Sequence, residues 1–474
     1  MLHHELWGDE IHSWNIAKAS SSFFDLITNI RYEGHPPVWY IILWTISKFT
    51  HDPFAIQIVH LAIAWLIVFL VLFYSPFPLS IKLLTPFGYF FLFEYSILSR
   101  NYAIGILIAF IICIIINKNF KGKILLYYVL LFLLSNSHLL SLLLAISFHV
   151  YFLLSQKEQT KNITQLYLHL VTGLIVFLPA IYFIYPPTDS SLNTHYWLSK
   201  WNIDQLSSIV QSPTRAFTPI PEWTQYHFWD TQFLISKGHF YSLPIWSVLL
   251  ISIGLILLCI SLLKADKKSL YFFLFNLILT GIVSLIIPFT NARHVGFIFI
   301  SLLIALWLCS FHKPLNEPQR KIVFIFFLLQ LIGGFIAITK DIKYPFSNGY
   351  SVNELLKEIP NQKIITDYWC LNNLEAFTDR SYYCIETQKE QSYLLWNSAL
   401  GSALKRADRY SSGISAFINQ GSITKVYLFS TQRLEKLQRL DESLFSMFSV
   451  SLFDKRDGAI EKGGDLYLYE IKVK

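Results

Sequence analysis

The chain has 474 residues, of which 54% are hydrophobic and 15% are charged, with a formal charge of +7. Soluble domains carry about 25% charged residues, so the composition excludes an ordinary soluble protein and indicates a polytopic membrane protein. The positive charge does not indicate nucleic-acid binding, because the excess Lys and Arg lie in short loops between apolar segments, as membrane topology demands.

Residues 1–53 are mostly polar or amphipathic, and we expect them to form a first external loop. Asp9 and Glu10 lie near its start. They are either solvated acids or a helix N-cap, or they serve as a general base or as ligands of a divalent cation. In "EGHPPVWY", His35 either caps the next helix or binds a substrate. The segment 37–49 is short for a span and is typical of an interfacial amphipathic helix. As a tilted first span, it would instead move the acidic pair inside.

Residues 54–340 contain a series of apolar segments, and a helix needs roughly 20 apolar residues to cross a membrane. The fourth and fifth segments are short and could be tilted or broken. We predict ten spans, at about 54–74, 81–98, 100–116, 124–137, 138–155, 166–185, 243–263, 268–288, 294–311 and 321–339.

The connections between these segments alternate in charge. Lys or Arg is present in each of "PLSIK", "NKNFKGK", "SQKEQTKN", "KADKK" and "HKPLNEPQRK". The positive-inside rule places these loops in the cytoplasm. The other connections, residues 1–53 and the tail after 340 then lie outside an inner or plasma membrane. An outside N-terminus without a preceding signal or helix is awkward to insert, so we expect a further span upstream of Met1.

Polar residues gather on the predicted outer face. In "FEYSILSRNYAIG", Glu94, Arg100 and Tyr102 separate two spans. An Arg that faces lipid costs about 2.5–3.5 kcal/mol. Arg100 is therefore expected to face a cavity and to pair with an acid or a phosphate, a structural pair with Glu94 being the alternative.

Two later connections add to this face. His138 in "SNSHLL" is either a structural histidine or a substrate ligand. Arg293 and His294 begin a later span, and snorkelling explains the arginine but does not require the histidine. Together, these acids, arginines and histidines suit a phosphorylated lipid whose headgroup reacts with an external acceptor, because Arg binds phosphate through a fork of donors.

Residues 341–474 differ in composition and alternate between strand-like and helix-like segments, which predicts a small α/β domain. The domain has no phosphate loop, Ser–His motif or metal spacing, and we expect it to bind or shield something. Cys370 and Cys384 could form a disulfide if this domain is external. The other cysteines lie in apolar segments and are expected to be inert packing residues.

The polar motifs resemble those of the GT-C superfamily of membrane glycosyltransferases, and within it the dolichyl-phosphate-mannose–protein mannosyltransferase-like family 39. The similar features are an acidic pair in the first external loop, a His-Pro-Pro before a juxtamembrane helix, an Arg-x-Tyr, and a late Arg-His where the family more often has Arg-Tyr. They stand at Asp9-Glu10, His35-Pro36-Pro37, Arg100 to Tyr102 and Arg293-His294. The resemblance is strongest from Gly8 to Asn117, covers 118–340 mainly in topology, and hardly includes the tail.

This resemblance implies inverting sugar transfer from a polyprenyl-phosphate donor to an external glycan, lipid or protein acceptor. Asp9 would take the acceptor proton, while Arg293 and Arg100 would hold the phosphate. Tyr102, His294 and His35 would orient phosphate or sugar, with His138 a further substrate-binding candidate. Glu10 and Glu94 could support the base or bind Mg or Mn, which some members of the superfamily use. In the family a transmembrane helix precedes the first loop, in agreement with the span expected upstream.

Two other function classes fit parts of the pattern. A transporter or flippase for an anionic lipid or solute would also place charges in cavities. Against it, the polar residues collect at one face, and the sequence has no internal repeat or paired broken helices. A catalytically inactive structural subunit of an envelope assembly is the second rival, and the acidic pair weighs mildly against it.

Overall fold

Helices make up most of the computed structural model, which describes residues 3–159, 162–191, 203–235, 242–287, 290–421 and 423–474. Within these described residues, seven helices are long and apolar enough to cross a membrane, and α14 is the most deeply buried of them. They are α4 (Phe54–Tyr74), α8 (Leu139–Gln159), α9 (Ile163–Ile184), α12 (Ile245–Leu263), α13 (Lys267–Ile286), α14 (Ala292–Ser310) and α15 (Glu317–Lys343). This confirms the predicted multi-pass helical protein.

The other three predicted spans are shorter or interrupted. Helices α6 (Tyr102–Ile116) and α7 (Lys123–Ser135) are apolar but have only 15 and 13 residues. We predicted a span at about 81–98, but this region does not form one continuous helix and is divided into three pieces. They are α5 (Leu79–Leu84), the 3₁₀ helix η2 (Thr85–Phe87) and the π-helix η3 (Phe90–Ile97).

The break in this region has a local cause. Pro86 has no N–H and clashes with a preceding helical turn, and it lies within η2. The backbone then turns extended at Gly88 before the π-helix begins. π-Helical turns are rare in proteins, and those that occur are often found at functional sites. This one carries Glu94.

The N-terminal segment forms short helices instead of a span. They are α1 (Gly8–Ala19), α2 (Phe23–Asn29), η1 (Ile30–Tyr32) and α3 (Val38–Ser47). With 10 residues, α3 is about 15 Å long, half of the hydrocarbon thickness, which favours the interfacial helix over a tilted first span at 37–49. Its Trp39, Tyr40 and Leu43 are buried, and the helix packs against α1.

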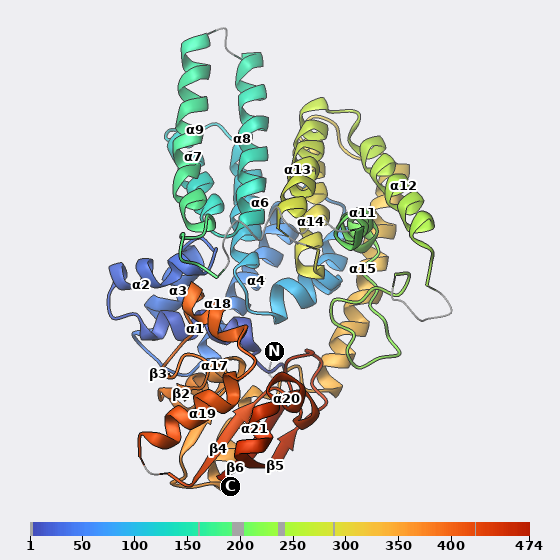
Figure 1. Cartoon of the computed structure of the whole chain (residues 1–474). Coiled ribbons are helices and arrows are strands. Elements are labelled where there is room, and N and C mark those ends of the chain that lie inside the picture. The colour runs from blue at the N-terminus through green and yellow to red at the C-terminus, as the bar shows by residue number, and fades with distance from the viewer. Residues whose placement is uncertain (1–2, 160–161, 192–202, 236–241, 288–289, 422) are drawn as a thin grey trace.

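Several basic connections lie at one end of the helices. Lys268 Nζ forms a 2.8 Å ion pair with Glu158, which joins the start of α13 to the end of α8. Gln319 on α15 donates to the Leu262 carbonyl of α12 at 3.2 Å. Figure 1 shows the C-terminal domain and the N-terminal segment together at the opposite end. These contacts therefore place the last residues of α8 and α12 and the first residues of α13 and α15 at the end away from the C-terminal domain.

The C-terminal region folds into the predicted α/β domain, a six-stranded sheet of order β3-β2-β1-β4-β6-β5. Its strands are β1 (Ile364–Thr366), β2 (Tyr382–Cys384), β3 (Lys389–Gln391), β4 (Lys425–Ser430), β5 (Phe448–Arg456) and β6 (Leu466–Val473). Its helices are η4 (Gly349–Ser351), α16 (Val352–Glu358), α17 (Tyr368–Thr378), α18 (Ser398–Leu404), α19 (Arg409–Asn419), α20 (Leu434–Leu440) and α21 (Glu442–Met447).

The central strand β1 pairs in parallel with both β2 and β4. Alternating side chains of β4 enter two separate cores, with Tyr427 and Phe429 packing on the α16–α17 side. Val426 and Leu428 pack on the side of α19, α20 and α21. Helices therefore cover both faces of the sheet.

Cys370 and Cys384 do not form the disulfide that the sequence allowed, because both are free, buried thiols. Cys370 lies on α17, and the Cys384 thiol on β2 instead donates to Glu386 Oε2 at 3.3 Å. Cys113, Cys259 and Cys309 are likewise buried and free, as predicted for packing residues.

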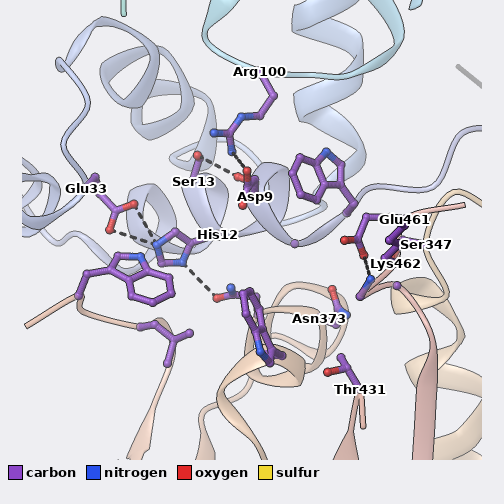
Figure 2. Close-up of a pocket in the computed structure, with 18 of the residues that line it drawn as sticks. Asp9, His12, Ser13, Glu33, Arg100, Ser347, Asn373, Thr431, Glu461 and Lys462 are labelled. Atoms are coloured by element: carbon purple, nitrogen blue, oxygen red, sulfur yellow. Dashed lines mark hydrogen bonds and ion pairs between the residues drawn. The ribbon is translucent and has the colours of Figure 1, made fainter. Parts of the chain in front are cut away.

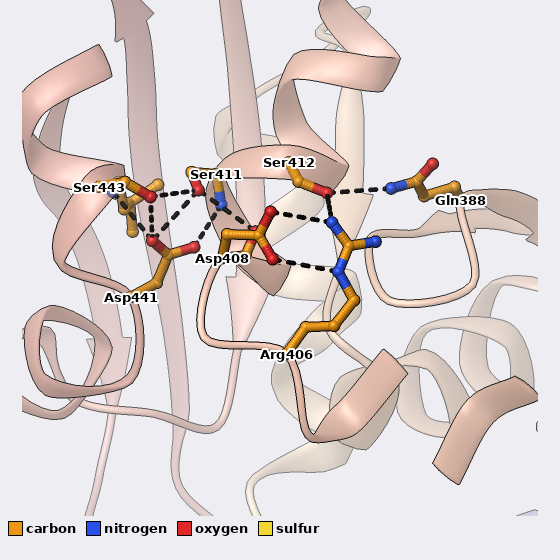
Figure 3. A network of polar contacts seen from close by, with 8 residues as sticks. Gln388, Arg406, Asp408, Ser411, Ser412, Asp441 and Ser443 are labelled. Atoms are coloured by element: carbon orange, nitrogen blue, oxygen red, sulfur yellow. Dashed lines mark hydrogen bonds and ion pairs between the residues drawn. The ribbon is translucent and has the colours of Figure 1, made fainter. Parts of the chain in front are cut away.

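A single carboxylate joins two helices of this domain (Figure 3). Asp441 caps α21 by accepting from Leu444 N at 3.1 Å. It also accepts from Ser411 N at 2.6 Å, Ser411 Oγ at 3.1 Å and Ser443 Oγ at 2.6 Å. The Asp441 side chain thus satisfies four donors at a position that is only 1% exposed.

Replacing Asp441 with alanine is expected to lower the free energy of unfolding by about 2 kcal/mol, because a cap and buried bonds to a carboxylate are lost together. Asp408 in Figure 3 is the matched control. It pairs with Arg406 at 2.9 Å, but half of its side chain is exposed, so Asp408→Ala should change stability little. Thermal unfolding of the two variants measures the difference, and equal losses would contradict this role for Asp441.

The N-terminal segment is joined to the C-terminal domain by polar contacts between α1 and α17. Asn15 Nδ2 donates to the Asn372 carbonyl at 3.0 Å. Lys18 Nζ lies 3.0 Å from Glu375 and 2.9 Å from Asp379. Residues more than 300 positions apart therefore form one structural unit.

His4 anchors this unit to the end of α15. Its Nδ1 lies 2.8 Å from Asp341 Oδ1, and its Nε2 lies 3.8 Å from Glu10 Oε2. Burial alone would lower the pKa of His4, but the two carboxylates outweigh it and raise the pKa to about 10. The imidazolium therefore holds together two buried acids.

His4→Gln is expected to destabilise the protein by about 3–5 kcal/mol near pH 6, as when one partner of a buried ion pair is removed. Because the pKa rises on folding, this stabilisation is complete below the ordinary pKa of 6.5 and is lost as the pH rises through about 10. The stability gap between wild type and His4→Gln should therefore shrink between these pH values. The exposed His51, which pairs with Asp379, provides the control His51→Gln. A gap that does not change with pH would contradict a charged His4.

Candidate active site

A cavity of about 430 Å³ lies between the N-terminal segment and the C-terminal domain (Figure 2). Helix α1 contributes Asp9, His12 and Ser13, and the loop between η1 and α3 contributes Glu33 and His35. The C-terminal domain lines the other side with Ser347, Trp369, Asn372, Asn373, Leu394, Trp396, Thr431, Gln432, Lys436, Glu461, Lys462, Gly463 and Gly464. The domain therefore covers one side of the cavity.

Asp9 lies in the first turn of α1 and meets two arginines from different parts of the chain. Its Oδ2 is 3.4 Å from Arg100 Nη1 and 3.7 Å from Arg293 Nη2. The side chain is surrounded by protein, yet 42% of its surface remains accessible because it faces the cavity. Burial alone would raise the pKa of Asp9, but the arginines lower it below its usual value. The carboxylate is therefore ionised at neutral pH.

The two arginines are held by tryptophans. The Arg293 guanidinium lies 5.3 Å from the Trp7 ring centre and 5.2 Å from that of Trp229. Arg100 lies 5.9 Å from the same Trp7 ring. Arg293 Nε and Nη1 are buried and have no hydrogen-bond partner among the described residues. Two guanidiniums facing one carboxylate leave a net positive charge and unused donors, which suit an anion.

Arg293 owes its position to the loop before α12. Asp230 Oδ1 accepts from the N–H of Ala292 at 2.7 Å and so caps the start of α14. The Asp230 backbone is left-handed, with φ 60°, an uncommon conformation for a residue other than glycine. Trp229 Nε1 donates to Glu94 Oε1 at 3.2 Å, and Tyr89 donates to the same oxygen at 2.7 Å. Glu94 therefore acts on the site through Trp229, and no ion pair with Arg100 forms between these described residues.

Four of the predicted residues form a cluster behind Asp9. Tyr102 lies with its hydroxyl 3.0 Å from His294 Nε2. Its ring centre is 4.4 Å from that of His138, which is 5.4 Å from that of His35. Of these rings, only His35 lines the cavity itself, so the other three can act by positioning it and the arginines.

The pKa values of two histidines at the cavity are shifted in opposite directions. Burial and the Arg100 charge lower the pKa of His35 to about 3, so this ring is neutral. Burial would also lower the pKa of His12, but the Glu33 carboxylate, 3.0 Å away, raises it overall. His12 Nδ1 lies 3.3 Å from Asn372 Oδ1. His12 therefore links α1 to both Glu33 and the C-terminal domain.

Glu10 does not face the cavity with Asp9. Its Oε1 accepts from the backbone N–H of Ser99, and its Oε2 accepts from that of Trp7 at 3.0 Å. The side chain is fully buried. These contacts attach α1 to the turn that carries Arg100, which is a positioning role.

The C-terminal domain also brings an acid, Glu461, to the cavity. Burial and the nearby Asp9 charge raise the pKa of Glu461 to about 7, although its carboxylate accepts from Gly463 N at 2.7 Å. Within the described part of the chain, no group of three or more His, Cys, Asp and Glu is arranged to hold a metal ion. We therefore assign no residues to a metal.

The structure thus brings together most of the predicted site. Asp9, His35 and Arg100 line the cavity, Arg293 reaches Asp9, and Tyr102, His138 and His294 lie behind them. Sequence reasoning missed Trp7, His12, Ser13 and Tyr40, as well as the whole lining from the C-terminal domain. His12, three positions after Asp9 and on the same helical face, is the one that spacing could have indicated.

Comparisons with protein-family models, with curated proteins and with solved structures found no match.

Proposed function

We propose that this chain is a membrane glycosyltransferase that moves a sugar from a polyprenyl-phosphate-linked donor to an acceptor, with inversion at the sugar. One observation carries the proposal: the ionised Asp9 carboxylate lies between two arginines in a cavity beside the membrane-spanning helices. A base next to an anion clamp is the arrangement that transfer from a glycosyl phosphate requires.

In the proposed reaction, an acceptor hydroxyl attacks the sugar carbon that bears the phosphate. A new carbon–oxygen bond forms while the bond to the phosphate oxygen breaks, and polyprenyl phosphate leaves with the electron pair. Asp9 orients the hydroxyl and takes its proton. Arg100 and Arg293 bind the phosphate and stabilise the charge that grows on it. The neutral His35 can donate to or accept from the sugar.

An apolar groove of about 330 Å³ between α11 (Ile203–Phe217), α12, α13 and α14 is suited to the prenyl chain. Leu249, Ile253, Ile256 and Ile278 are among its lining residues, with Val295 and Ile298 from the first turns of α14. Burying a methylene contributes roughly 0.8 kcal/mol. Since Arg293 belongs to the same end of α14, one helix would contact both the headgroup and the tail.

The side of the membrane is part of this proposal. The basic connections lie at the end away from the cavity, and the positive-inside rule assigns such loops to the cytoplasm. The cavity and the C-terminal domain would then be extracytoplasmic, where the acceptor, a glycan, lipid or protein of the cell envelope, is found.

Transfer can be distinguished from transport by following the chemical linkage of a labelled sugar. Proteoliposomes with wild-type protein or Asp9→Asn would receive polyprenyl-phosphate sugars that carry a radiolabel in the sugar, together with envelope extract as acceptor. A transferase moves the label out of the lipid-phosphate linkage, and Asp9→Asn does not. Label that crosses the bilayer with its linkage intact in both proteins would instead establish a flippase.

A further inference from the structure

The cavity lies at the carboxyl edge of the parallel strands in the C-terminal domain. From β1 the chain passes through α17 to β2 on one side, while β4 pairs on the other side of β1. In open α/β sheets, ligands bind outside the carboxyl ends of the strands where the strand order reverses in this way. Trp369 follows β1, Thr431 and Gln432 follow β4, and all three line the cavity. The fold thus directs its usual ligand-binding edge at Asp9.

The lining at this edge is aromatic and amide-rich. Trp369 is 49% exposed, so one ring face is open to a ligand. Trp396 lies with its ring centre 6.1 Å from that of His12, and its carbonyl accepts from Ser191 N at 2.9 Å, which fixes its loop. Aromatic rings with a polar edge pack on apolar faces while leaving hydrogen bonds available.

One polar group at this edge has an unused hydrogen-bonding capacity. Asn373 is 7% exposed, and its Oδ1 has no hydrogen-bond partner among the described residues. Because Asn373 lines the cavity, a ligand hydroxyl can contact its amide, which both donates and accepts hydrogen bonds. Gly349 packs against this amide, since an added Cβ would lie 2.7 Å from Asn373 Cγ, so the side chain is held in place.

We propose that this half of the cavity binds the acceptor and that the acceptor is a saccharide. A pyranose ring stacks on Trp369 or Trp396, and Asn372, Asn373 and Gln432 bond its hydroxyls, since amides both donate and accept. One hydroxyl of the ring then points to Asp9. The acceptor role rests on the proposed function, whereas the saccharide site rests on this lining alone.

The test is saturation-transfer NMR on the full chain in detergent. The probes are methyl pyranosides and disaccharides of glucose, galactose, mannose and N-acetylglucosamine, with a Ser/Thr-containing peptide as the competing class. At least one saccharide should receive saturation from the wild-type protein, and Trp369→Ala and Trp396→Ala should reduce that signal at least fivefold. Trp65→Ala is the control, because Trp65 is an exposed residue of the span α4.

Asn373→Ala is a smaller change that should also weaken the signal, and thermal unfolding identifies any variant that fails to fold. No signal from any of the saccharides, equal signals in wild type and both Trp variants, or peptide binding lost through Trp369→Ala would each overturn the inference. Saccharide binding without any affinity for polyprenyl phosphate would remove the proposed function but keep the saccharide site. Donor binding without saccharide binding would overturn the saccharide site but keep the proposed function.

Discussion

Asp9→Asn is expected to lower the rate of sugar transfer by about 10²- to 10⁴-fold, the usual contribution of a general base. Asparagine has nearly the same shape but cannot take a proton. Donor affinity should be unchanged or higher, because the substitution removes the negative charge that lies 3.4 Å from Arg100 and 3.7 Å from Arg293. Measuring kcat and KM for the donor separates these two effects.

Asp52→Asn is the matched control for this experiment. Asp52 is an exposed acid just before α4, so its substitution should leave both constants unchanged. The low pKa of Asp9 also means that lowering the pH from 8 to 6 should not titrate the base. A wild-type rate in Asp9→Asn, or a loss of donor affinity without a loss of kcat, would show that Asp9 is not the base.

Arg293→Ala is expected to lower transfer by about 10²- to 10³-fold, the cost of removing one preorganised donor to a developing anion. Its guanidinium lies between Trp7 and Trp229, with Nη2 3.7 Å from Asp9 Oδ2, so the fold holds it in place beside the proposed base. Arg293→Lys keeps the charge but loses the planar fork and should recover only part of the rate.

The control for Arg293 is Arg380→Ala, an exposed arginine of the C-terminal domain. Because a phosphate is bound before and during the reaction, Arg293→Ala should raise KM for the donor as well as lower kcat. Full activity in Arg293→Lys together with none in Arg293→Ala would show that charge alone matters. Unchanged kinetics in Arg293→Ala would remove the phosphate clamp from the account.

The membrane helices could be predicted from hydropathy because lipid imposes a single requirement of length and apolarity on each span. The interruption at Pro86 could not be predicted from hydropathy, because the segment from 81 to 98 is mostly apolar and the break depends on the backbone of a single proline. In the tail, strand periodicity predicted the domain, but the segment "KIITDYW" becomes helical from Tyr368 onward because Asp367 accepts from Cys370 N at 3.0 Å and caps α17.

The candidate site could be predicted only in part, because it is built from residues that lie far apart along the chain and meet only in the fold. Asp9, Arg100 and Arg293 are charged groups next to apolar segments, and the cost of burying charge makes such residues conspicuous. Trp369 and Asn373 are ordinary residues of an α/β domain, and no local pattern indicates that they meet α1. Likewise, Asp9 and Glu10 look equivalent in sequence, and only the contacts of Glu10 with Ser99 and Trp7 assign it another role.

The central claim is that Arg100 and Arg293 bind the phosphate of a polyprenyl lipid while Asp9 serves as a separate base. The most direct measurement is the thermal unfolding of wild type, Arg293→Ala and Asp9→Asn during titration with undecaprenyl phosphate. A hundredfold excess over the dissociation constant should stabilise the fold by about 2.7 kcal/mol. The account predicts this shift for wild type and Asp9→Asn but not for Arg293→Ala. Equal shifts in all three proteins, or none in any, would contradict it.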